Sequence, residues 1–281
     1  MEKNLAFNNI ELKQSEFDKL SNYIFTNYGI KMPPAKKVML QSRLQKRLRH
    51  LNITNFKSYI DFVFSKEGEQ EIIHMMDVVS TNKTDFFREP THFEFMEEVI
   101  LPEIYANKQS EMKIWSAGSS SGEEAYTITM VMEEYIQKHG HINYQILGAD
   151  ISTDMLKNAV NGVYKLEKII PIPESLKKKY FLKSKDPQKK LVRVKPHLRT
   201  KVKFFRLNLM DTVYNAPKGF DLIFCRNTLI YFERDTQEKV INRLCDHLKP
   251  GGYFILGHSE SITNMKVPLE NIKPTIFRKT F

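Results

Sequence analysis

The feature that most constrains how this chain folds is a change of pattern at about Lys113, after which short apolar runs alternate with stretches of helical periodicity. Strands are predicted at 113–116, 144–149, 201–207, 221–225 and 253–256, and helices between them at 123–138, 152–161 and 236–248. Strands that alternate with helices favour a mainly parallel sheet with right-handed crossovers. The second half of the chain is therefore predicted to be an α/β domain.

The first eighty residues have a different pattern, typical of amphipathic helices. Phe17, Leu20 and Ile24 recur at helical spacing, and Ser15 with Asp18 resembles an N-terminal capping pair. Further helices are predicted at about 35–51, 56–65 and 70–79. These segments predict a separate helical domain at the N-terminus.

One segment of the α/β half does not follow its alternation. The stretch from about 167 to 200 is rich in Lys and Pro, and within it residues 191–194 form an isolated strand candidate. We expect an inserted lobe there, with a small antiparallel sheet. The predicted layout is a helical domain over 1–80, a linker over 81–93 and an α/β domain over 94–281.

Composition bounds the class of protein. The hydrophobic fraction of 41% is enough for a packed core, and no run approaches the roughly 18 apolar residues of a membrane span. The first residues lack the apolar core of a signal peptide, so we expect a cytoplasmic protein that does not insert into a membrane. Cys225 and Cys245 lie in apolar runs, and their spacing predicts neither a disulfide nor a metal site. The formal charge of +10 favours a negatively charged partner: nucleic acid, acidic lipid or an acidic protein surface.

The most informative stretch is the turn after the first predicted strand, which passes through Gly118 and Gly122 into a helix. In a doubly wound sheet the ligand lies over this turn. Asp150 ends the next predicted strand, where a carboxylate can accept hydrogen bonds from both ribose hydroxyls. Glu123 and Glu124 open the helix and would repel a pyrophosphate. The turn therefore disfavours NAD and suits S-adenosylmethionine, which has an ammonium and a sulfonium but no phosphate.

Motifs along the chain add a family resemblance. They are Asn-Lys-Thr-Asp-Phe-Phe-Arg at 82–88, the turn at 116–126, Phe-Cys-Arg-Asn-Thr-Leu-Ile-Tyr-Phe at 224–232, and the C-terminal stretches 248–252 and 257–261. In this order they resemble the CheR-type chemotaxis methyltransferases over nearly the whole length. The resemblance implies a Rossmann-like class I S-adenosylmethionine-dependent methyltransferase domain, an all-helical N-terminal domain and a small inserted antiparallel β-subdomain.

The resemblance also implies a reaction and a set of site residues. The reaction is methyl transfer from S-adenosylmethionine to glutamate side chains of a chemoreceptor, which gives methyl esters and S-adenosylhomocysteine. Arg88 would hold the substrate carboxylate and Tyr231 would lie beside the transferred methyl group as the catalytic residues. Glu124 would contact the amino-acid part of the cofactor, and Asp150 the ribose. The full set of implied cofactor residues is Asn82, Thr84, Arg88, Gly118, Glu124, Asp150, Asn208, Leu209, Arg226 and Asn227.

The predicted helix at 35–51 is a candidate surface for the substrate. Its apolar stripe is Leu40, Leu44, Leu48 and Leu51, and Lys36, Arg43, Lys46, Arg47 and His50 cluster on an adjacent face. Many helices carry a solvated basic face of this kind without a ligand. The resemblance implies an acidic partner, since chemoreceptor methylation regions are acidic helical bundles. We therefore expect Arg43, Lys46 and Arg47 to bind substrate. Separately, we expect the protein to act as a monomer.

Two alternative functions remain open. The first alternative is a methyltransferase acting on RNA or on a small molecule, although no aromatic-rich RNA-binding motif is seen and nucleic acid is not expected as a partner. The second is a non-catalytic sensor or scaffold that binds S-adenosylmethionine.

In some family members a glycine-bearing loop of the β-subdomain docks on a receptor peptide. The corresponding stretch here, 183–190, has four lysines and no glycine, so we do not expect such tethering.

Overall fold

The computed structural model describes residues 10–107, 109 and 111–280, and the described part begins with the helical domain. The helices of this domain are α2 (Gln14–Tyr28), α3 (Lys37–Leu51), α4 (Phe56–Val63) and α5 (Glu69–Val79). Their apolar faces form a separate core around side chains such as Phe17, Leu44 and Tyr59. The predicted helical domain is confirmed from residue 10 onward. The first nine residues lie outside the described part.

The start of α2 differs from the prediction. The helix begins at Gln14, and Glu16 Oε2 accepts a hydrogen bond from the Lys13 backbone N–H at 2.8 Å. Ser15 and Asp18 lie inside the helix, so the predicted capping pair at these residues is wrong. The position that precedes the helix is a lysine, a residue type that gives no N-cap signal in a sequence.

The α/β domain is built on a seven-stranded sheet. Its strands are β1 (Glu111–Ala117), β2 (Asn143–Asp150), β6 (Val202–Arg206), β7 (Phe220–Cys225), β8 (Leu248–Leu256), β9 (Leu269–Lys273) and β10 (Ile276–Lys279). The order is β6-β2-β1-β7-β8-β10-β9, with parallel pairing from β6 to β8 and antiparallel pairing of β10 on both sides. The chain moves outward from β1 first toward β6 and later toward β8. This reversal places a ligand crevice at the carboxyl ends of β1 and β7.

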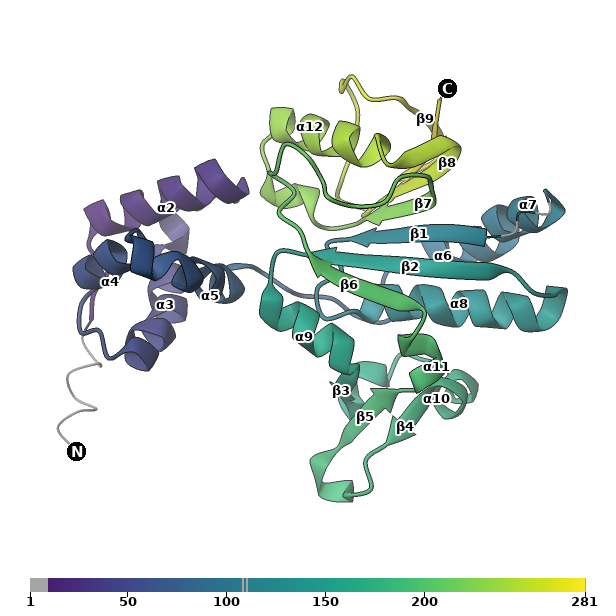
Figure 1. Ribbon diagram of the computed structural model, residues 1–281, viewed down its shortest axis with the longest axis horizontal. Coiled ribbons are helices and arrows are strands. Elements are labelled where there is room, and N and C mark those ends of the chain that lie inside the picture. Colours follow the sequence, from purple (N-terminus) through teal and green to yellow (C-terminus); the bar gives the residue numbers. More distant parts are fainter. Residues whose placement is uncertain (1–9, 108, 110, 281) are drawn as a thin grey trace.

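Helices cover both faces of this sheet (Figure 1). One core lies beneath α8 (Glu123–His139), and α9 (Thr153–Asn161) packs beside β6 on the same side. The other core lies beneath α12 (Arg234–Cys245). Every residue of β7 is buried, as its mainly apolar sequence predicts for a central strand covered on both sides. The predicted Rossmann-like α/β fold is confirmed.

The C-terminal part of the sheet differs from the prediction in two ways. The predicted helix at 236–248 ends at Cys245, and β8 starts at Leu248. The reason lies in His247, whose carbonyl accepts hydrogen bonds from Gly219 N and Phe220 N and whose ring lies edge-on to a buried tryptophan. The sequence pattern also predicted neither β9 nor β10.

The inserted lobe contains a three-stranded antiparallel sheet in the order β3-β5-β4. Its strands are β3 (Val163–Lys165), β4 (Phe181–Lys183) and β5 (Leu191–Val194), with α10 (Glu174–Tyr180) between β3 and β4. The predicted antiparallel sheet is confirmed, and the isolated strand candidate at 191–194 is its central strand. The predicted interval, about 167–200, leaves out β3, which starts at Val163.

The segment between the two domains runs from the end of α5 to the start of β1. It includes the helices α6 (Thr91–Phe95) and α7 (Leu101–Ala106), with a wider π-helical turn at Met96–Ile100 between them. The sequence pattern predicted no helix in this segment. In the described part of the chain, no helix is long and apolar enough to cross a membrane.

Candidate active site

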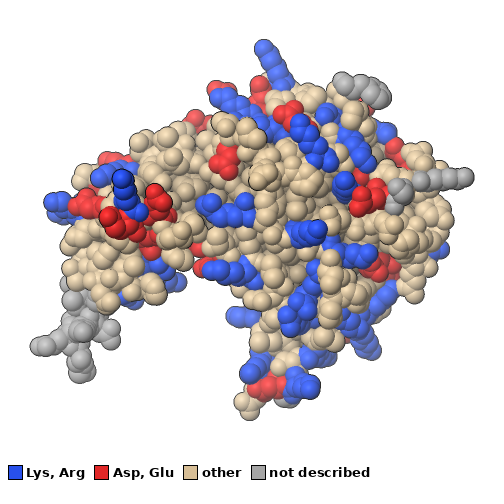
Figure 2. All heavy atoms as spheres, viewed as in Figure 1, with Lys and Arg blue, Asp and Glu red and all other residues tan. Residues whose placement is uncertain are grey.

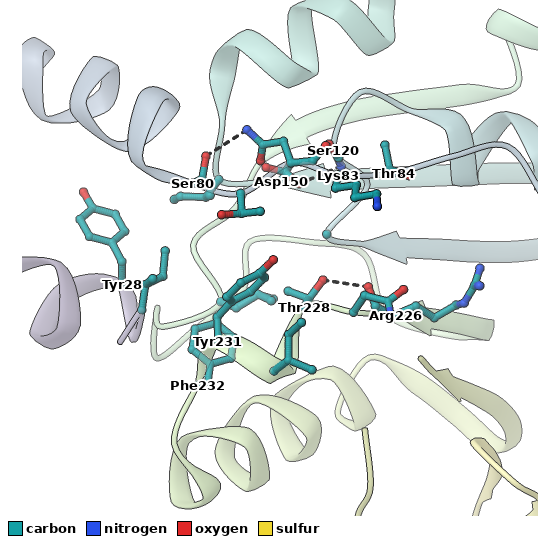
Figure 3. Close-up of a pocket in the computed structure, with 18 of the residues that line it drawn as sticks. Tyr28, Ser80, Lys83, Thr84, Ser120, Asp150, Arg226, Thr228, Tyr231 and Phe232 are labelled. Atoms are coloured by element: carbon teal, nitrogen blue, oxygen red, sulfur yellow. Dashed lines mark hydrogen bonds between the residues drawn. The ribbon is translucent and has the colours of Figure 1, made fainter. Parts of the chain in front are cut away.

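A pocket of about 270 Å³ lies between the helical domain and the carboxyl ends of the parallel strands. The structure brings all the predicted cofactor residues and Tyr231 to this one pocket. Its lining includes Asn82, Thr84, Arg88, Gly118, Glu124, Asp150, Asn208, Leu209, Arg226, Asn227 and Tyr231. Figure 3 shows Asp150 with the linker residues Lys83 and Thr84 on one side, and Thr228 with Arg226 on the other.

The turn after β1 is shaped by a glycine. Gly118 has a φ of +87°, in the left-handed region, and a Cβ added there would lie 2.2 Å from Thr228 Oγ1. Any side chain at this position would therefore collide with the opposite wall of the pocket. The backbone N–H groups of Gly118 and Ser119 both donate to Ala149 O at 2.8 Å, which fixes the turn to the end of β2.

Asp150 lies at the end of β2 with its carboxylate almost fully buried. Its Oδ2 accepts a hydrogen bond from Ser120 N at 2.8 Å, and its Oδ1 accepts one from Ser152 N at 2.9 Å. Burial raises the pKa of Asp150 above its ordinary value, and these backbone donors oppose the rise. A carboxylate has about four acceptor positions, so each oxygen can still accept a hydrogen bond from a ribose hydroxyl.

Glu124, Arg226 and Glu89 form a largely buried chain of charges, of which Glu124 and Arg226 line the pocket. Arg226 is only 6% exposed, and its guanidinium binds Glu124 Oε2 at 3.1 Å and Glu89 Oε2 at 3.0 Å. Glu124 Oε1 also accepts a hydrogen bond from Ser116 Oγ at 2.7 Å. Burial raises the pKa of Glu124, and the Arg226 charge opposes the rise. Burial also acts to raise the pKa of Glu89, but Arg226 and further hydrogen bonds hold it below its ordinary value.

The loop after β7 is held by two glutamates that the sequence analysis did not select. Glu260 accepts hydrogen bonds from the backbone N–H groups of Gly257, Asn227, Leu229 and Ile230. Glu89 Oε1 accepts a hydrogen bond from Asn227 Nδ2 at 3.2 Å. Glu89 directly follows the predicted Arg88, and this neighbour position was the signal available in the sequence.

The linker brings Arg88 into the pocket. Arg88 Nη1 donates to Lys83 O at 3.1 Å, and Arg88 O accepts a hydrogen bond from Arg226. A guanidinium carries five donors, so Arg88 can still bind a carboxylate through two parallel hydrogen bonds. Lys168 of the inserted lobe donates to Thr84 O at 2.8 Å, and so the lobe supports the linker from outside.

The helical domain forms the remaining wall. Tyr28, Ile30 and Met32 line the pocket from the end of α2 and the residues after it, and the sequence analysis selected none of them. Figure 3 shows Tyr28 on the side of the helical domain and Tyr231 between it and Thr228. Asn208 Nδ2 donates to Asn27 O at 2.8 Å, so this predicted cofactor residue also joins the two domains.

The predicted substrate-binding residues of α3 lie outside the pocket lining. Arg47 makes a paired ion bridge to Glu71, with Nε–Oε1 at 2.8 Å and Nη2–Oε2 at 2.6 Å. Arg43 Nη1 donates to Val79 O and Ser80 O at the end of α5. Lys46 is exposed. The structure therefore gives Arg43 and Arg47 partners within their own domain, and it leaves Lys46 as the predicted residue that faces solvent.

Three possible metal ligands come together beside the charge chain. In the part of the chain that the structure describes, ligand atoms of Glu89, His92 and His258 lie within 4.8 Å of one another. The Arg226 guanidinium already binds Glu89, and its positive charge opposes a cation at this place. Burial and the Arg226 charge lower the pKa of His92 to about 4, which keeps its ring neutral near pH 7. These three residues are therefore better explained by a neutral, packed His92 beside an ion pair than by a metal centre.

Comparison with known proteins identifies the family. Residues 15–80 match the family described as CheR methyltransferase, all-alpha domain, and residues 82–277 match CheR methyltransferase, SAM binding domain. The chain is 40% identical over 277 residues to the chemotaxis protein methyltransferase of Borreliella burgdorferi, with 96% of each chain covered. It is 33% identical to that of Salmonella typhimurium, over 91% of this chain and 87% of the relative.

A further relative is chemotaxis protein methyltransferase 2 of Pseudomonas aeruginosa, which is 31% identical over 94% of this chain and 92% of the relative. The matches confirm the resemblance drawn from the motifs and the prediction of S-adenosylmethionine as the cofactor. The two family domains together span most of the chain, in the order that the structure shows. The chain therefore belongs to the CheR methyltransferase family.

Proposed function

We propose that this protein transfers the methyl group of S-adenosylmethionine to glutamate side chains of a chemoreceptor and so forms glutamate methyl esters. The observation that carries the proposal is the position of Arg88, a partly exposed guanidinium in the same pocket as the Asp150 turn. A guanidinium there suits a substrate carboxylate. The relatives' name, chemotaxis protein methyltransferase, supports a receptor as the carrier of that carboxylate.

The chemistry needs alignment more than acid–base catalysis. A glutamate carboxylate is ionised at pH 7, because its unperturbed pKa is about 4.3, and it can attack the sulfonium methyl group without a general base. The S–C bond breaks as the O–C bond forms, and S-adenosylhomocysteine leaves as a neutral thioether. The gain from the protein is therefore the fixed orientation of the two reactants. In this proposal Asp150 holds the ribose, Arg88 holds the carboxylate and Tyr231 orients it.

The charge of the chain supports an acidic protein as substrate. Lys and Arg side chains prevail on the lobe of the inserted sheet (Figure 2), and Lys46 adds an exposed cation on the helical domain. A basic surface speeds the encounter with an acidic partner and orients it. We propose the acidic methylation helices of chemoreceptors as the partner and a monomer as the acting form. Because the segment 183–190 has no glycine, we propose that binding does not depend on a tethered receptor peptide.

A defined receptor fragment tests the proposal. The purified protein is incubated with S-adenosylmethionine and the cytoplasmic fragment of a chemoreceptor, and mass spectrometry locates the added methyl groups. We expect methylation at glutamates, and loss of each site when that glutamate is changed to Gln, which cannot form the ester. Methyl transfer to RNA but not to the fragment would contradict the proposal. A protein that binds the cofactor and transfers nothing would support the sensor alternative.

A further inference from the structure

A carboxylate of the helical domain reaches into the α/β domain next to the cofactor pocket. Asp77 lies on α5, and its side chain is 2% exposed. Its Oδ1 accepts a hydrogen bond from Ser152 Oγ at 2.8 Å, and its Oδ2 accepts one from Thr153 Oγ1 at 2.8 Å. Asp154 N also donates to Oδ1 at 3.3 Å. All three donors lie at the start of α9, so Asp77 binds the N-terminus of a helix in the other domain.

The residues that Asp77 binds belong to the turn that carries Asp150. Ser152 N donates to Asp150 Oδ1 at 2.9 Å, while Ser152 Oγ donates to Asp77. Ser152 is fully buried, and its neighbour Ile151 packs against the core of the helical domain. One serine thus connects the carboxylate of the helical domain with the carboxylate at the pocket.

We propose that Asp77 is a positioning residue, which sets the turn 150–153 for cofactor binding and makes cofactor affinity depend on the docking of the helical domain. This inference rests on the proposed contact between Asp150 and the cofactor ribose. Hydroxyl donors are directional, and a buried hydroxyl without a partner is costly. When Asp77 cannot accept, Ser152 and Thr153 turn toward other acceptors, and the Ser152 N–H that orients Asp150 moves with them.

The coupling acts in both directions. If the docked helical domain favours cofactor binding, bound cofactor must favour docking by the same factor. Cofactor should therefore slow amide hydrogen exchange at residues 72–77 of α5, none of which lines the pocket, whereas Val79 at the end of the helix does line it and is left out of the comparison. This protection distinguishes a positioning role from a merely structural one, because a residue that only stabilises its own domain gives no such dependence on cofactor.

The test compares two substitutions of Asp77. Asp77→Leu keeps the approximate shape of the side chain and removes both acceptors. Asp77→Asn keeps one acceptor for Ser152, and its amide can donate to Thr153 Oγ1, which as a hydroxyl accepts equally well. Titration calorimetry with S-adenosylhomocysteine should show Kd about five- to tenfold weaker for the Leu variant, the lower end of typical coupling between sites. The Asn variant should stay within about twofold of the wild type and keep the exchange protection of α5.

Two reference variants separate the possible failures. Glu71→Gln removes the charge of the partner of Arg47 on the same helix α5, so it destabilises the helical domain without touching the turn. Its cofactor affinity should match the wild type, and weakening equal to that of Asp77→Leu would overturn the inference. If Asp150→Ala weakens binding while folded Asp77→Leu binds normally, the inference fails alone. If Asp150→Ala binds normally, the proposed cofactor site fails and the inference with it.

A milder substitution keeps the test decisive if Asp77→Leu does not fold. Thr153→Val removes one of the two hydroxyl donors and preserves the shape of a partly exposed residue. It should weaken S-adenosylhomocysteine binding by about two- to threefold, less than the loss of both acceptors. It should also reduce the cofactor-dependent protection of α5. Wild-type affinity together with wild-type protection in Thr153→Val would overturn the inference.

Discussion

Replacing Asp150 by Ala should weaken S-adenosylmethionine binding strongly. Each carboxylate oxygen accepts one backbone N–H, from Ser120 at 2.8 Å and from Ser152 at 2.9 Å, and can accept one ribose hydroxyl as well. Hydrogen bonds to charged groups contribute about 1.5–3 kcal/mol each. Water replaces part of what is lost, so we expect a net loss equal to one such bond, which makes Kd about 10- to 150-fold weaker.

The Asn substitution at Asp150 sharpens this expectation. Both carboxylate oxygens face backbone N–H groups, so an asparagine side chain at this position would place its NH₂ group against one of these donors. Asp150→Asn should therefore recover little affinity. Asp154→Ala is the matched control, because this neighbouring carboxylate is exposed and pairs with Lys157. Titration calorimetry gives Kd, and circular dichroism verifies the fold. A folded Asp150→Ala variant with wild-type affinity would refute the reasoning.

The remaining predictions concern the chemical step, the buried histidine and the basic helix. Arg88→Ala should lose single-turnover rate well beyond any loss of cofactor affinity, with partial rescue by Lys and a milder loss in Tyr231→Phe; near-normal turnover in Arg88→Ala would sink the positioning role. Burial lowers the pKa of His92 to about 4, so as the pH falls the unfolded chain takes up this proton before the folded protein does. The stabilisation from the neutral ring is therefore complete above about pH 6.5 and is lost as the pH falls toward 4. Urea titrations should show that this histidine lowers the free energy of unfolding by about 2 kcal/mol between pH 7 and pH 5, and His92→Gln should reduce this dependence on pH. An unchanged dependence on pH in the variant would contradict the buried neutral ring. Arg47→Met should cost about 3 kcal/mol of stability because it leaves a buried carboxylate unpaired, whereas Lys46→Glu should leave stability intact and raise KM for receptor, and an unaltered KM would return this face to an ordinary solvated role.

The architecture could be predicted where the sequence has a strong period. The central strand β7 is apolar except for Asp221 and is buried on both faces, so its run of hydrophobic residues was unambiguous. The edge strand β9 is exposed at four of its five residues, and it carries no apolar run that a sequence reveals. The end of α12 was misjudged because the helical pattern continues to Leu248, while the backbone of His247 is bound by the start of β7.

The candidate site was predicted where motifs lie close together in the chain. The glycine turn, Asp150 and the linker are each local signals, and the resemblance supplied the rest. Glu89 was missed because its partners Arg226 and Asn227 are more than a hundred residues away, and only the fold brings them together. The same reason applies to Asp77, whose partners at the start of α9 belong to another domain.

The basic helix shows the opposite limit of sequence patterns. Arg43, Lys46 and Arg47 share one helical face, and a pattern cannot distinguish a guanidinium that is paired from one that faces solvent. The structure pairs Arg47 with Glu71 and uses Arg43 to bind the last carbonyls of α5. The fold thus gives partners to Arg43 and Arg47 and leaves Lys46 exposed, although all three residues fit the same pattern in the sequence.

Labelled methyl transfer to membranes tests the central claim most directly. The protein is incubated with methyl-labelled S-adenosylmethionine and membranes that contain chemoreceptors, in parallel with the Arg88→Ala variant. We expect label on a receptor-sized protein that base releases as methanol, since base hydrolyses a methyl ester and spares an N-methyl group, and we expect little label with the variant. Label that resists base, or label confined to RNA, would contradict the claim that this protein forms glutamate methyl esters.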